Sequence, residues 1–411
     1  MIDLMIMSLG GSPEPLKKSI DEHNPKCIIF LASHDSIQIS CDIITAQVQQ
    51  PKVIYEITED PNSMFECYKA ARRCVERQSR MGFEAENVVV DYTGGTKVMT
   101  AGLILATIGE PYRFNYVGGE QRNKGGLGTV INGSEKMYAE MSPWSIFAEE
   151  ERRQVISLFN LHRYSSVARI IDSLLQKELP VEIEGYFAFV KPLADGFLCW
   201  EQFRHKDAVK HLKDGIAELR RYMHLYGSTE LNDFSSSLDI SKNFLNELVN
   251  STKGITIMHS VLVDDLLNNA RRRLRDERFD DASARIYRAL ELHGQIRFSQ
   301  VIGCTNDKVP ADKIPASIRH EFSRKYMDPK SRKLKLPLQA TFQVLHMLGD
   351  ESGKKFFTKQ EEIRNIQSSR NFSILAHGIN PVSKYTAESI FKTVAEFVDF
   401  KDVLDFPSLP Q

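Results

Sequence analysis

The first 135 residues alternate short apolar runs with amphipathic segments, and this alternation constrains the fold of the chain more than any other feature. Short apolar runs are typical of buried strands, whereas apolar residues at three- and four-residue spacing are typical of helices. Their alternation predicts an α/β, Rossmann-like domain with a mostly parallel, doubly wound sheet. The expected strands are residues 2–8, 26–32, 52–57, 87–91 and 112–117, and the expected helices lie near residues 14–23, 36–48, 61–80 and 97–108.

Beyond Ser142 the pattern is helical, with few strand signals. We expect a Rossmann-like ligand-sensing domain (residues 1–140), an all-α linker module (141–264) and a C-terminal helical bundle (265–411). The segment Phe159–Ala168 resembles a helix-turn-helix repeat element, but it is found once, so the sequence predicts no repeat architecture. The last helices are expected near residues 338–349, 355–375 and 383–405.

The balance of charges argues against a protein that holds nucleic acid through its overall field. The chain has 411 residues, with 53 Lys and Arg against 54 Asp and Glu and a formal net charge of −1. RNA contact must therefore come from local patches such as the basic runs 271–275 and 319–335, although charge runs are more often solvated faces. The six cysteines contain no C-x-x-C pair, which argues against a zinc site and a disulfide framework. No apolar stretch is long enough to cross a bilayer, and we expect a cytoplasmic protein without a membrane contact.

The stretch Asp91-Tyr-Thr-Gly-Gly-Thr-Lys-Val-Met99 joins an expected strand to an expected helix. Backbone N–H groups at the start of a helix are unpaired and lie at the positive end of the helix dipole, and glycine leaves room for a ligand to approach them. The spacing matches neither the P-loop nor the dinucleotide G-x-G-x-x-G motif. The stretch therefore predicts either a phosphate site or a strand-to-helix turn that uses glycine for its geometry.

Small and polar loops also follow the other expected strands, and a glycine-bearing hairpin is expected over residues 121–131. Because the carboxyl ends of parallel strands meet at one edge of a sheet, these loops favour a ligand site over a plain turn. His34 and Asp35 also fit a simpler role, as a strand end followed by a helix N-cap. The candidate ligand-binding residues are Gly10, Gly11, Ser12, Ser33, His34, Asp35, Thr93, Gly94, Gly95, Thr96, Lys97, Gly118 and Gly119.

A second candidate site lies near the C-terminus, in Ser369-Arg-Asn-Phe-Ser-Ile-Leu-Ala-His-Gly378. Arg370 and His377 are seven residues apart, which in a continuous helix places them on one face. Imidazole can move the proton of a ribose 2′-OH or of a leaving oxygen, and arginine offsets charge that develops on phosphate, so the pair can serve RNA cleavage without a metal. One helix supplies only one copy of each group, so two copies would have to face each other across a dimer.

Arginine followed at this spacing by histidine is a weak signal by itself, because chance gives about two such matches in a chain of this composition. Arg204 with His211 and Arg288 with His293 also fit it. His293 lies in an apolar helical segment, which favours a packed or capping residue over a catalyst. For Arg370 and His377 the alternative is a surface arginine beside a histidine that caps a helix before Gly378.

Two family resemblances distinguish these motifs. Arg370-Asn-Phe-Ser-Ile-Leu-Ala-His-Gly378 resembles the signature of HEPN-type ribonucleases, and Asp91–Met99 resembles that of the CRISPR-associated Rossmann fold (CARF) domain. The segment Asp281–Leu292 resembles a helix of one CARF–HEPN subfamily. The order, CARF first and HEPN last, is similar to that of the ancillary ribonucleases of type III CRISPR systems, which cyclic oligoadenylate activates.

The resemblance implies roles for the candidate residues. Arg370 and His377 would be catalytic, with Asn371 assisting, in a metal-independent endoribonuclease that cleaves single-stranded RNA to a 2′,3′-cyclic phosphate and needs no cofactor. The candidate loops would bind cyclic tetra- or hexa-adenylate at the axis of a homodimer, since a symmetric ligand suits a two-fold receptor. Lys97 and the backbone amides would contact phosphates, and Thr93, Thr96 and Asp35 would contact ribose or adenine. The first loop, Ser8–Ser12, departs from the Gly-Thr pattern of many relatives.

Two alternatives stay open. The chain could be a nucleotide sensor whose C-terminal bundle binds RNA or a partner without cleavage. The CARF pocket could also cut its own activator, as a ring nuclease, with Thr93, Thr96 or Ser12 positioning a 2′-OH. The sequence does not specify the ring size of the activator, the preferred RNA sequence or the role of the middle helical module.

Overall fold

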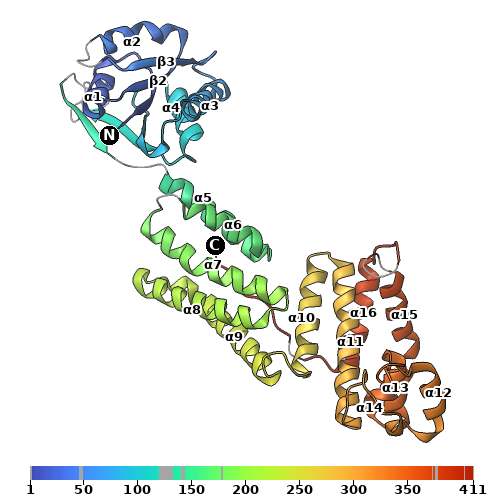
Figure 1. The fold of residues 1–411 in the computed structure, drawn as a ribbon. Helices are drawn as coiled ribbons and strands as arrows, with labels where there is room; N and C mark the ends of the chain where they lie inside the picture. Colours follow the sequence, from blue (N-terminus) through green and yellow to red (C-terminus); the bar gives the residue numbers. More distant parts are fainter. Residues whose placement is uncertain are drawn as a thin grey trace. The chain divides into compact units, whose positions relative to one another are not determined.

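A computed structural model of the chain describes residues 2–45, 50–119, 133–139, 144–176, 179–372, 374, 378–401 and 403–410. The chain divides into two compact units, Met1–Phe187 and Ala188–Pro410, with Gln411 assigned to the first. Figure 1 shows a sheet flanked by helices at the start of the chain and helices alone over the rest. In the described residues no helix is both long enough and apolar enough to cross a membrane. The boundaries expected at 140/141 and 264/265 stay predictions.

The first unit contains a six-stranded sheet in the order β3-β2-β1-β4-β5-β6. The first five strands are parallel, and β6 pairs antiparallel with β5. The Rossmann-like fold is therefore confirmed, while β6 was not foreseen, and the hairpin expected over residues 121–131 lies outside the described residues. The strands are β1 (Leu4–Ser8), β2 (Cys27–Ala32), β3 (Lys52–Ile57), β4 (Val88–Asp91), β5 (Arg113–Gly119) and β6 (Glu135–Ala139).

Helices cover both faces of this sheet. On one face α1 (Pro13–His23) and α2 (Ile37–Ile44) pack on an apolar layer that includes Met5, Met7 and Phe30, and on the other α3 (Met64–Met81) and α4 (Lys97–Thr107) pack on a second layer. Every residue of β1 and β2 is buried, as continuous apolar strands between two helical layers should be. The short 3₁₀ turns η1 (His34–Ser36) and η2 (Ala85–Asn87) lie next to β2 and β4.

The rest of the chain is helical, as expected, with two differences. The single helix expected over 355–375 is two helices, which break at Lys359. The helix expected over 383–405 ends at Val398, because Asp399 adopts the left-handed conformation. The helices are α5 (Trp144–Asn160), α6 (Tyr164–Leu174), α7 (Val181–Glu201), α8 (His205–Tyr226), α9 (Asn232–Ser251), α10 (Val261–Arg275), α11 (Phe279–Ile302), α12 (Ala316–Tyr326), α13 (Leu338–Met347), α14 (Glu351–Thr358), α15 (Gln360–Phe372) and α16 (Lys384–Val398), with η4 (Thr229–Leu231) and η5 (Ala311–Lys313).

One helix-to-helix turn occurs three times, which corrects the expectation that the repeat-like element is found once. The turns α5–α6, α7–α8 and α10–α11 each contain a residue with positive φ followed by an arginine whose N–H bonds to the carbonyl five residues earlier. This is the hydrogen-bond pattern of a Schellman C-cap. The positive-φ residues are His162, Phe203 and Glu277, and a small residue five positions after each, Val167, Ala208 or Ala282, is fully buried.

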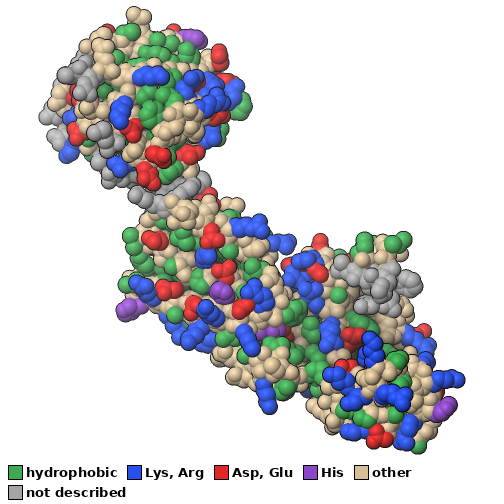
Figure 2. Space-filling model, in the orientation of Figure 1, with side chains coloured by type: hydrophobic (Ala, Val, Ile, Leu, Met, Phe, Trp, Pro, Cys, Tyr) green, Lys and Arg blue, Asp and Glu red, His purple; other side chains and the backbone are tan. Residues whose placement is uncertain are grey.

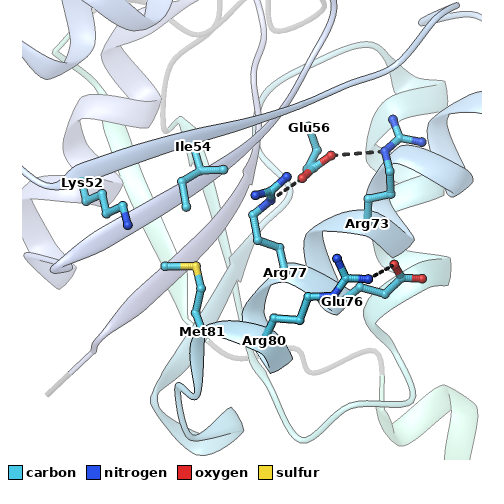
Figure 3. Close-up of a pocket in the computed structure, with 8 residues that line it drawn as sticks. All are labelled: Lys52, Ile54, Glu56, Arg73, Glu76, Arg77, Arg80 and Met81. Atoms are coloured by element: carbon cyan, nitrogen blue, oxygen red, sulfur yellow. Dashed lines mark hydrogen bonds and ion pairs between the residues drawn. The ribbon is translucent and has the colours of Figure 1, made fainter.

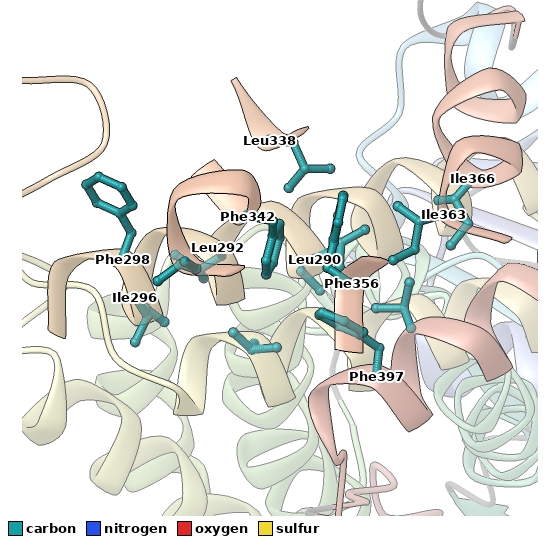
Figure 4. Packing of buried hydrophobic residues seen from close by; sticks show 14 of the residues in the cluster. Leu290, Leu292, Ile296, Phe298, Leu338, Phe342, Phe356, Ile363, Ile366 and Phe397 are labelled. Carbon is teal, nitrogen blue, oxygen red and sulfur yellow. The ribbon is translucent and has the colours of Figure 1, made fainter. Parts of the chain in front are cut away.

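The C-terminal bundle has its own core, drawn from α10, α11 and α13 to α16 (Figure 4). The rings of Phe342 and Phe356 stack at 4.3 Å, and Phe397 meets both edge-on. Val309, Leu334 and other residues between α11 and α13 belong to the same cluster. The irregular connection is therefore anchored to the bundle.

After α16 the chain is not helical, and residues 403–410 pack against α7, α10 and their neighbours. Phe406 lies 4.5 Å from the ring of Phe197, and its ring is 3.8 Å from the guanidinium carbon of Arg272. Arg272 is 1% exposed and donates to Glu201 at 2.5 Å. This tail therefore covers a buried ion pair between α7 and α10.

Candidate ligand site and catalytic segment

The topology of the sheet changes direction between β1 and β4. The chain builds β2 and β3 on one side of β1, then returns to place β4 on the other side. In such sheets the crevice at the carboxyl ends of the two central strands is where ligands bind. The loops Ser8–Ser12 and Asp91–Lys97 both begin at this point, so the fold brings together two of the four loops that were expected to form a site.

The two loops are in direct backbone contact. The Ser8 hydroxyl donates to the Gly94 carbonyl at 2.6 Å. A Cβ at Gly10 would lie 2.2 Å from the Gly95 nitrogen, and one at Gly94 would lie 2.3 Å from the Ser8 carbonyl oxygen. Gly95 has φ +86°, which favours glycine. The glycines therefore allow the two loops to pack in backbone contact at the ends of β1 and β4.

The polar residues after β4 mostly serve the loop itself. Thr96 is the N-cap of α4: its hydroxyl accepts from the Met99 N–H at 3.1 Å and donates to the Pro61 carbonyl at 2.7 Å. The Thr93 hydroxyl accepts from the Val117 N–H at 2.8 Å. Lys97, by contrast, is exposed at the first position of α4. The lysine is therefore better placed than either threonine to reach an anionic ligand.

Asp91 is a positioning residue that sequence analysis did not single out. It is fully buried at the end of β4 and accepts hydrogen bonds from Ser19 at 2.5 Å, Asn115 at 2.6 Å and the Thr93 N–H at 2.9 Å. Burial raises the pKa of this carboxyl, and the hydrogen bonds oppose that shift. The available signal was a carboxylate at the end of an otherwise apolar strand.

The remaining candidate ligand residues lie along the same edge of the sheet, with different surroundings. Ser33 and Ser36 form a capping box at η1, and His34 and Asp35 are exposed. Gly118 and Gly119 lie inside β5 and not in the loop after it, and a Cβ at Gly118 would meet the Tyr138 ring at 2.6 Å. Gly11 and Ser12 are exposed after β1.

A cavity of about 250 Å³ lies elsewhere on the first unit, between β3 and α3 (Figure 3). Four basic side chains line it, but Glu56 accepts from Arg77 at 2.5 Å and Arg73 at 3.2 Å, and Arg80 pairs with Glu76 at 3.7 Å. A second cavity, of about 470 Å³, lies in the bundle beside His293. None of the candidate ligand residues lines either of these two cavities.

Two of the three catalytic candidates belong to the end of α15. The backbone of Arg370 and Asn371 is in its last turn, and their side chains lie outside what the structure describes. His377 lies outside the described residues entirely. The prediction that one continuous helix carries Arg370 and His377 on a single face depends on residues outside the described ones, so it stays a prediction. Beyond α15, Ile374, Ile379 and Tyr385 expose large apolar side chains, with Ile379 85% exposed.

The other Arg–His matches have structural roles. Arg204 pairs with Asp207, and Arg288 bonds to Gln295. His293 bonds to Ser352 at 3.2 Å and packs edge-on against Phe397; burial lowers its pKa to about 4, helped by the nearby Arg297 and Lys355. The expectation that His293 is packed is therefore confirmed.

These features define a class of protein: a Rossmann-type domain with glycine-containing loops at its switch point, joined to all-α modules. The family models agree. Residues 147–245 match the Csm6 6H domain and residues 252–401 match the Csm6 HEPN domain, which together cover more than half of the chain. The chain therefore belongs to the Csm6-type CARF–HEPN family of CRISPR-associated proteins. The HEPN match supports the expected class, a HEPN-type ribonuclease.

One solved structure shows the same fold over almost the whole chain. Csm6 of Enterococcus italicus bound to cyclic hexa-2′-fluoro-hexa-dAMP aligns with a TM-score of 0.60 and 11% sequence identity, over 97% of this chain and 94% of that chain. Two further structures align with TM-scores too low to indicate a shared overall fold. Can2 of Sulfobacillus thermosulfidooxidans with cyclic tetra-adenylate has a TM-score of 0.26 at 14% identity, over 50% of this chain and 68% of that one. A type III CRISPR defence DNA nuclease activated by cyclic oligoadenylate has a TM-score of 0.25 at 16% identity, over 47% of this chain and 34% of that one. No curated protein sequence matches the chain.

Proposed function

We propose that this protein is an endoribonuclease of a type III CRISPR system that cyclic oligoadenylate activates through the CARF domain. The observation that carries the proposal is the backbone contact of the β1 and β4 loops at the switch point, in a chain whose C-terminal region matches a Csm6 HEPN domain. The first feature supplies a place for a phosphate-rich ligand, and the second supplies the activity that the ligand controls.

The ligand site is built for phosphates and not for one adenine. Glycine keeps side chains away from the N–H groups before α4, and Lys97 adds a positive charge at the same end of the helix. Asp91 holds Thr93 from beneath, so the loop is ordered before ligand arrives. Residues 10–12, 33–35, 93–97 and 118–119 are proposed to contact a cyclic tetra- or hexa-adenylate.

A two-fold ligand calls for a second copy of the chain. Large apolar side chains are exposed where α3 begins and along α4, next to the β4 loop: Met64, Phe65, Tyr68 and Leu105. The two helices pack closely at Gly102, where a Cβ would lie 3.0 Å from the Tyr68 nitrogen. We infer that this apolar surface forms the homodimer contact of the CARF domain, which would close the open half-site of one chain.

The ribonuclease chemistry is proposed for the segment that ends α15. His377 would move the proton of the ribose 2′-OH or of the leaving 5′-oxygen, and Arg370 would offset the charge on the phosphate, with Asn371 assisting. Attack by the 2′-oxygen on the adjacent phosphorus breaks the bond to the 5′-oxygen and leaves a 2′,3′-cyclic phosphate. Exposed Ile374, Ile379 and Tyr385 support a second dimer contact, which would bring two such segments together.

The test is an RNA cleavage assay in EDTA with labelled single-stranded RNA and a panel of cyclic oligoadenylates. We expect one ring size to stimulate cleavage and His377→Ala to abolish it while activator binding is unchanged. Cleavage that survives in His377→Ala would remove the catalytic assignment, and absence of stimulation by every ring would remove the signalling half. Analysis of the activator after incubation reports whether linear oligoadenylate forms, as a ring nuclease would require.

A further inference from the structure

The two basic runs, 271–275 and 319–335, differ in how many of their cations form ion pairs. In the run 271–275, Arg272 and Arg273 bind the buried Glu201, and Arg271 and Arg275 bind Asp405. These four arginines therefore form ion pairs that connect α10 to α7 and to the C-terminal tail. The second run belongs to the connection between α11 and α13, residues 305–337, which we call the basic lobe.

The basic lobe is the part of the bundle where positive charge accumulates. It contains nine Lys or Arg residues against four Asp or Glu, in a chain whose net charge is −1. Figure 2 shows Lys and Arg side chains gathered over the region where Figure 1 places α12 and α13. A local excess of this kind produces a positive field that the whole chain lacks.

The fold of the lobe turns these charges outward. Val309, Ile314 and Phe322 are buried in the bundle core, and Val309 and Met327 both form bridges with buried Leu334. The two residues that flank Leu334, Lys333 and Lys335, are consequently exposed, as the alternation of an extended segment requires. The apolar side chains of the lobe are packed in the bundle core, and its basic side chains lie on the surface.

Most of this charge is not neutralised by the lobe's own acids. Asp328 is held by the Ser331 hydroxyl at 2.6 Å and by Lys335 at 3.3 Å, within the turn. The other eight cations of the lobe are exposed and form no ion pair among the residues that the structure describes. Lys313 and Arg319 bond to backbone carbonyls, and Lys325 lies over the Tyr326 ring. The remaining five are Lys308, Arg324, Lys330, Arg332 and Lys333. Unpaired, exposed and fixed cations are what a polyphosphate chain binds best.

We propose that the basic lobe is a docking surface for the backbone of single-stranded RNA, separate from the cleavage site. The proposal rests on the ribonuclease function for its choice of RNA over another polyanion. Figure 1 shows α12 at one end of the bundle and the C-terminal end of α15 toward the other. The 13 residues of α15 alone span about 20 Å, and a stacked strand advances about 3.4 Å per nucleotide, so a stacked RNA that reaches both ends is longer than roughly six nucleotides.

The test uses the variant Lys330→Gln/Arg332→Gln/Lys333→Gln in full-length His377→Ala protein, so that RNA is bound and not cut. A matched control, Lys206→Gln/Lys210→Gln/Lys213→Gln, removes three exposed charges from α8. Fluorescence anisotropy with labelled 20-nucleotide and 5-nucleotide polyuridine gives the Kd for each. We expect the 20-mer Kd to rise at least fivefold in the lobe variant, with the slope of log K against log salt smaller by about two, and little change for the 5-mer.

Equal affinity of lobe variant and parent for the 20-mer would overturn the proposal, and would leave a protein partner as the occupant of the surface. An equal loss in the α8 control would also overturn it, because net charge alone would then explain the effect. Thermal unfolding of each variant checks that the fold is kept. The binding assay needs neither cleavage nor activator. If the wild-type protein cuts no RNA, the proposed function is contradicted, and the binding assay still tests the role of the lobe. With active protein, the lobe variant should raise KM for the 20-mer and leave kcat unchanged.

Discussion

At the scale of single residues, the proposed ligand site depends on two glycines that carry no Cβ. Gly10 and Gly94 allow two loops to approach within backbone contact, and their role is visible only when a Cβ is placed on them. Gly11, in the same loop, has no atom within 4 Å of such a Cβ. Adjacent glycines that look alike in the sequence therefore differ in what they do.

Gly94→Ala is predicted to disrupt the ligand site. Its Cβ would overlap the Ser8 carbonyl oxygen, so the loops must separate, at a cost of about 1–3 kcal/mol. We expect a lower Tm and at least tenfold weaker binding of the activating cyclic oligoadenylate, measured by calorimetry. Gly11→Ala is the matched control and should change neither. Wild-type affinity in Gly94→Ala would mean that the ligand does not use this contact.

His293 is predicted to make stability depend on pH. Burial lowers its pKa to about 4 in the folded chain, below the value of about 6.5 expected when unfolded. Between these values the unfolded chain binds a proton that the folded chain does not, so the free energy of unfolding falls as pH falls through this window. The loss should be about 2 kcal/mol between pH 7.5 and pH 5, measured by urea unfolding. His293→Gln should remove this component, and His320→Gln, at an exposed position, should not.

At the scale of elements, the recurring turn forms without the glycine that usually marks it, and a buried residue five positions later is common to all three copies. A Schellman cap ordinarily has glycine at its left-handed position, and here His162, Phe203 and Glu277 occupy it. None of the three turns therefore carries the local residue that marks such a cap, and only the segment Phe159–Ala168 resembles a repeat element in the sequence. The buried residue five positions later, with the arginine between, is the part of the pattern that the three turns share.

The C-terminal tail is predicted to stabilise the helical unit out of proportion to its length. Phe406 is 6% exposed and packs on Phe197, Trp200 and Arg272. Phe406→Ala should lower the free energy of unfolding by about 3–5 kcal/mol, since it opens a cavity beside a buried charge. Urea unfolding followed by tryptophan fluorescence measures the change. Ser408→Ala, at an exposed position of the same tail, should stay within about 0.5 kcal/mol of the parent.

At the scale of the whole molecule, both proposed sites are incomplete in one chain. The switch-point loops form an open surface, and one chain supplies one Arg370 and one His377. Exposed apolar residues lie close in sequence to both sites, on α3 and α4 and again at Ile374, Ile379 and Tyr385. Dimerisation is therefore proposed as the step that makes both sites functional.

The double variant Phe65→Glu/Leu105→Glu is predicted to weaken the dimer. Burying two carboxylates without partners in an apolar contact is unfavourable, so the monomer fraction should rise at least tenfold in sedimentation equilibrium. Activator binding and stimulated cleavage should fall with it. Asp21→Lys, at an exposed position of α1, is the surface control and should leave the dimer intact. A dimer of unchanged affinity in the double variant would move the contact to another face.

The sequence alone determined the order of strands and helices in the first unit and which loops share an edge, because buried parallel strands and their helices have distinct apolar periods. It also located both motifs through their resemblance to known families. Only the tertiary structure decided that β6 completes the sheet, that Asp91 is a buried support, and that the cations of one basic run are ion-paired while most of those in the other are not. Those outcomes depend on contacts between residues far apart in the chain, such as Arg272 with Glu201, and a local pattern of residue types does not contain them.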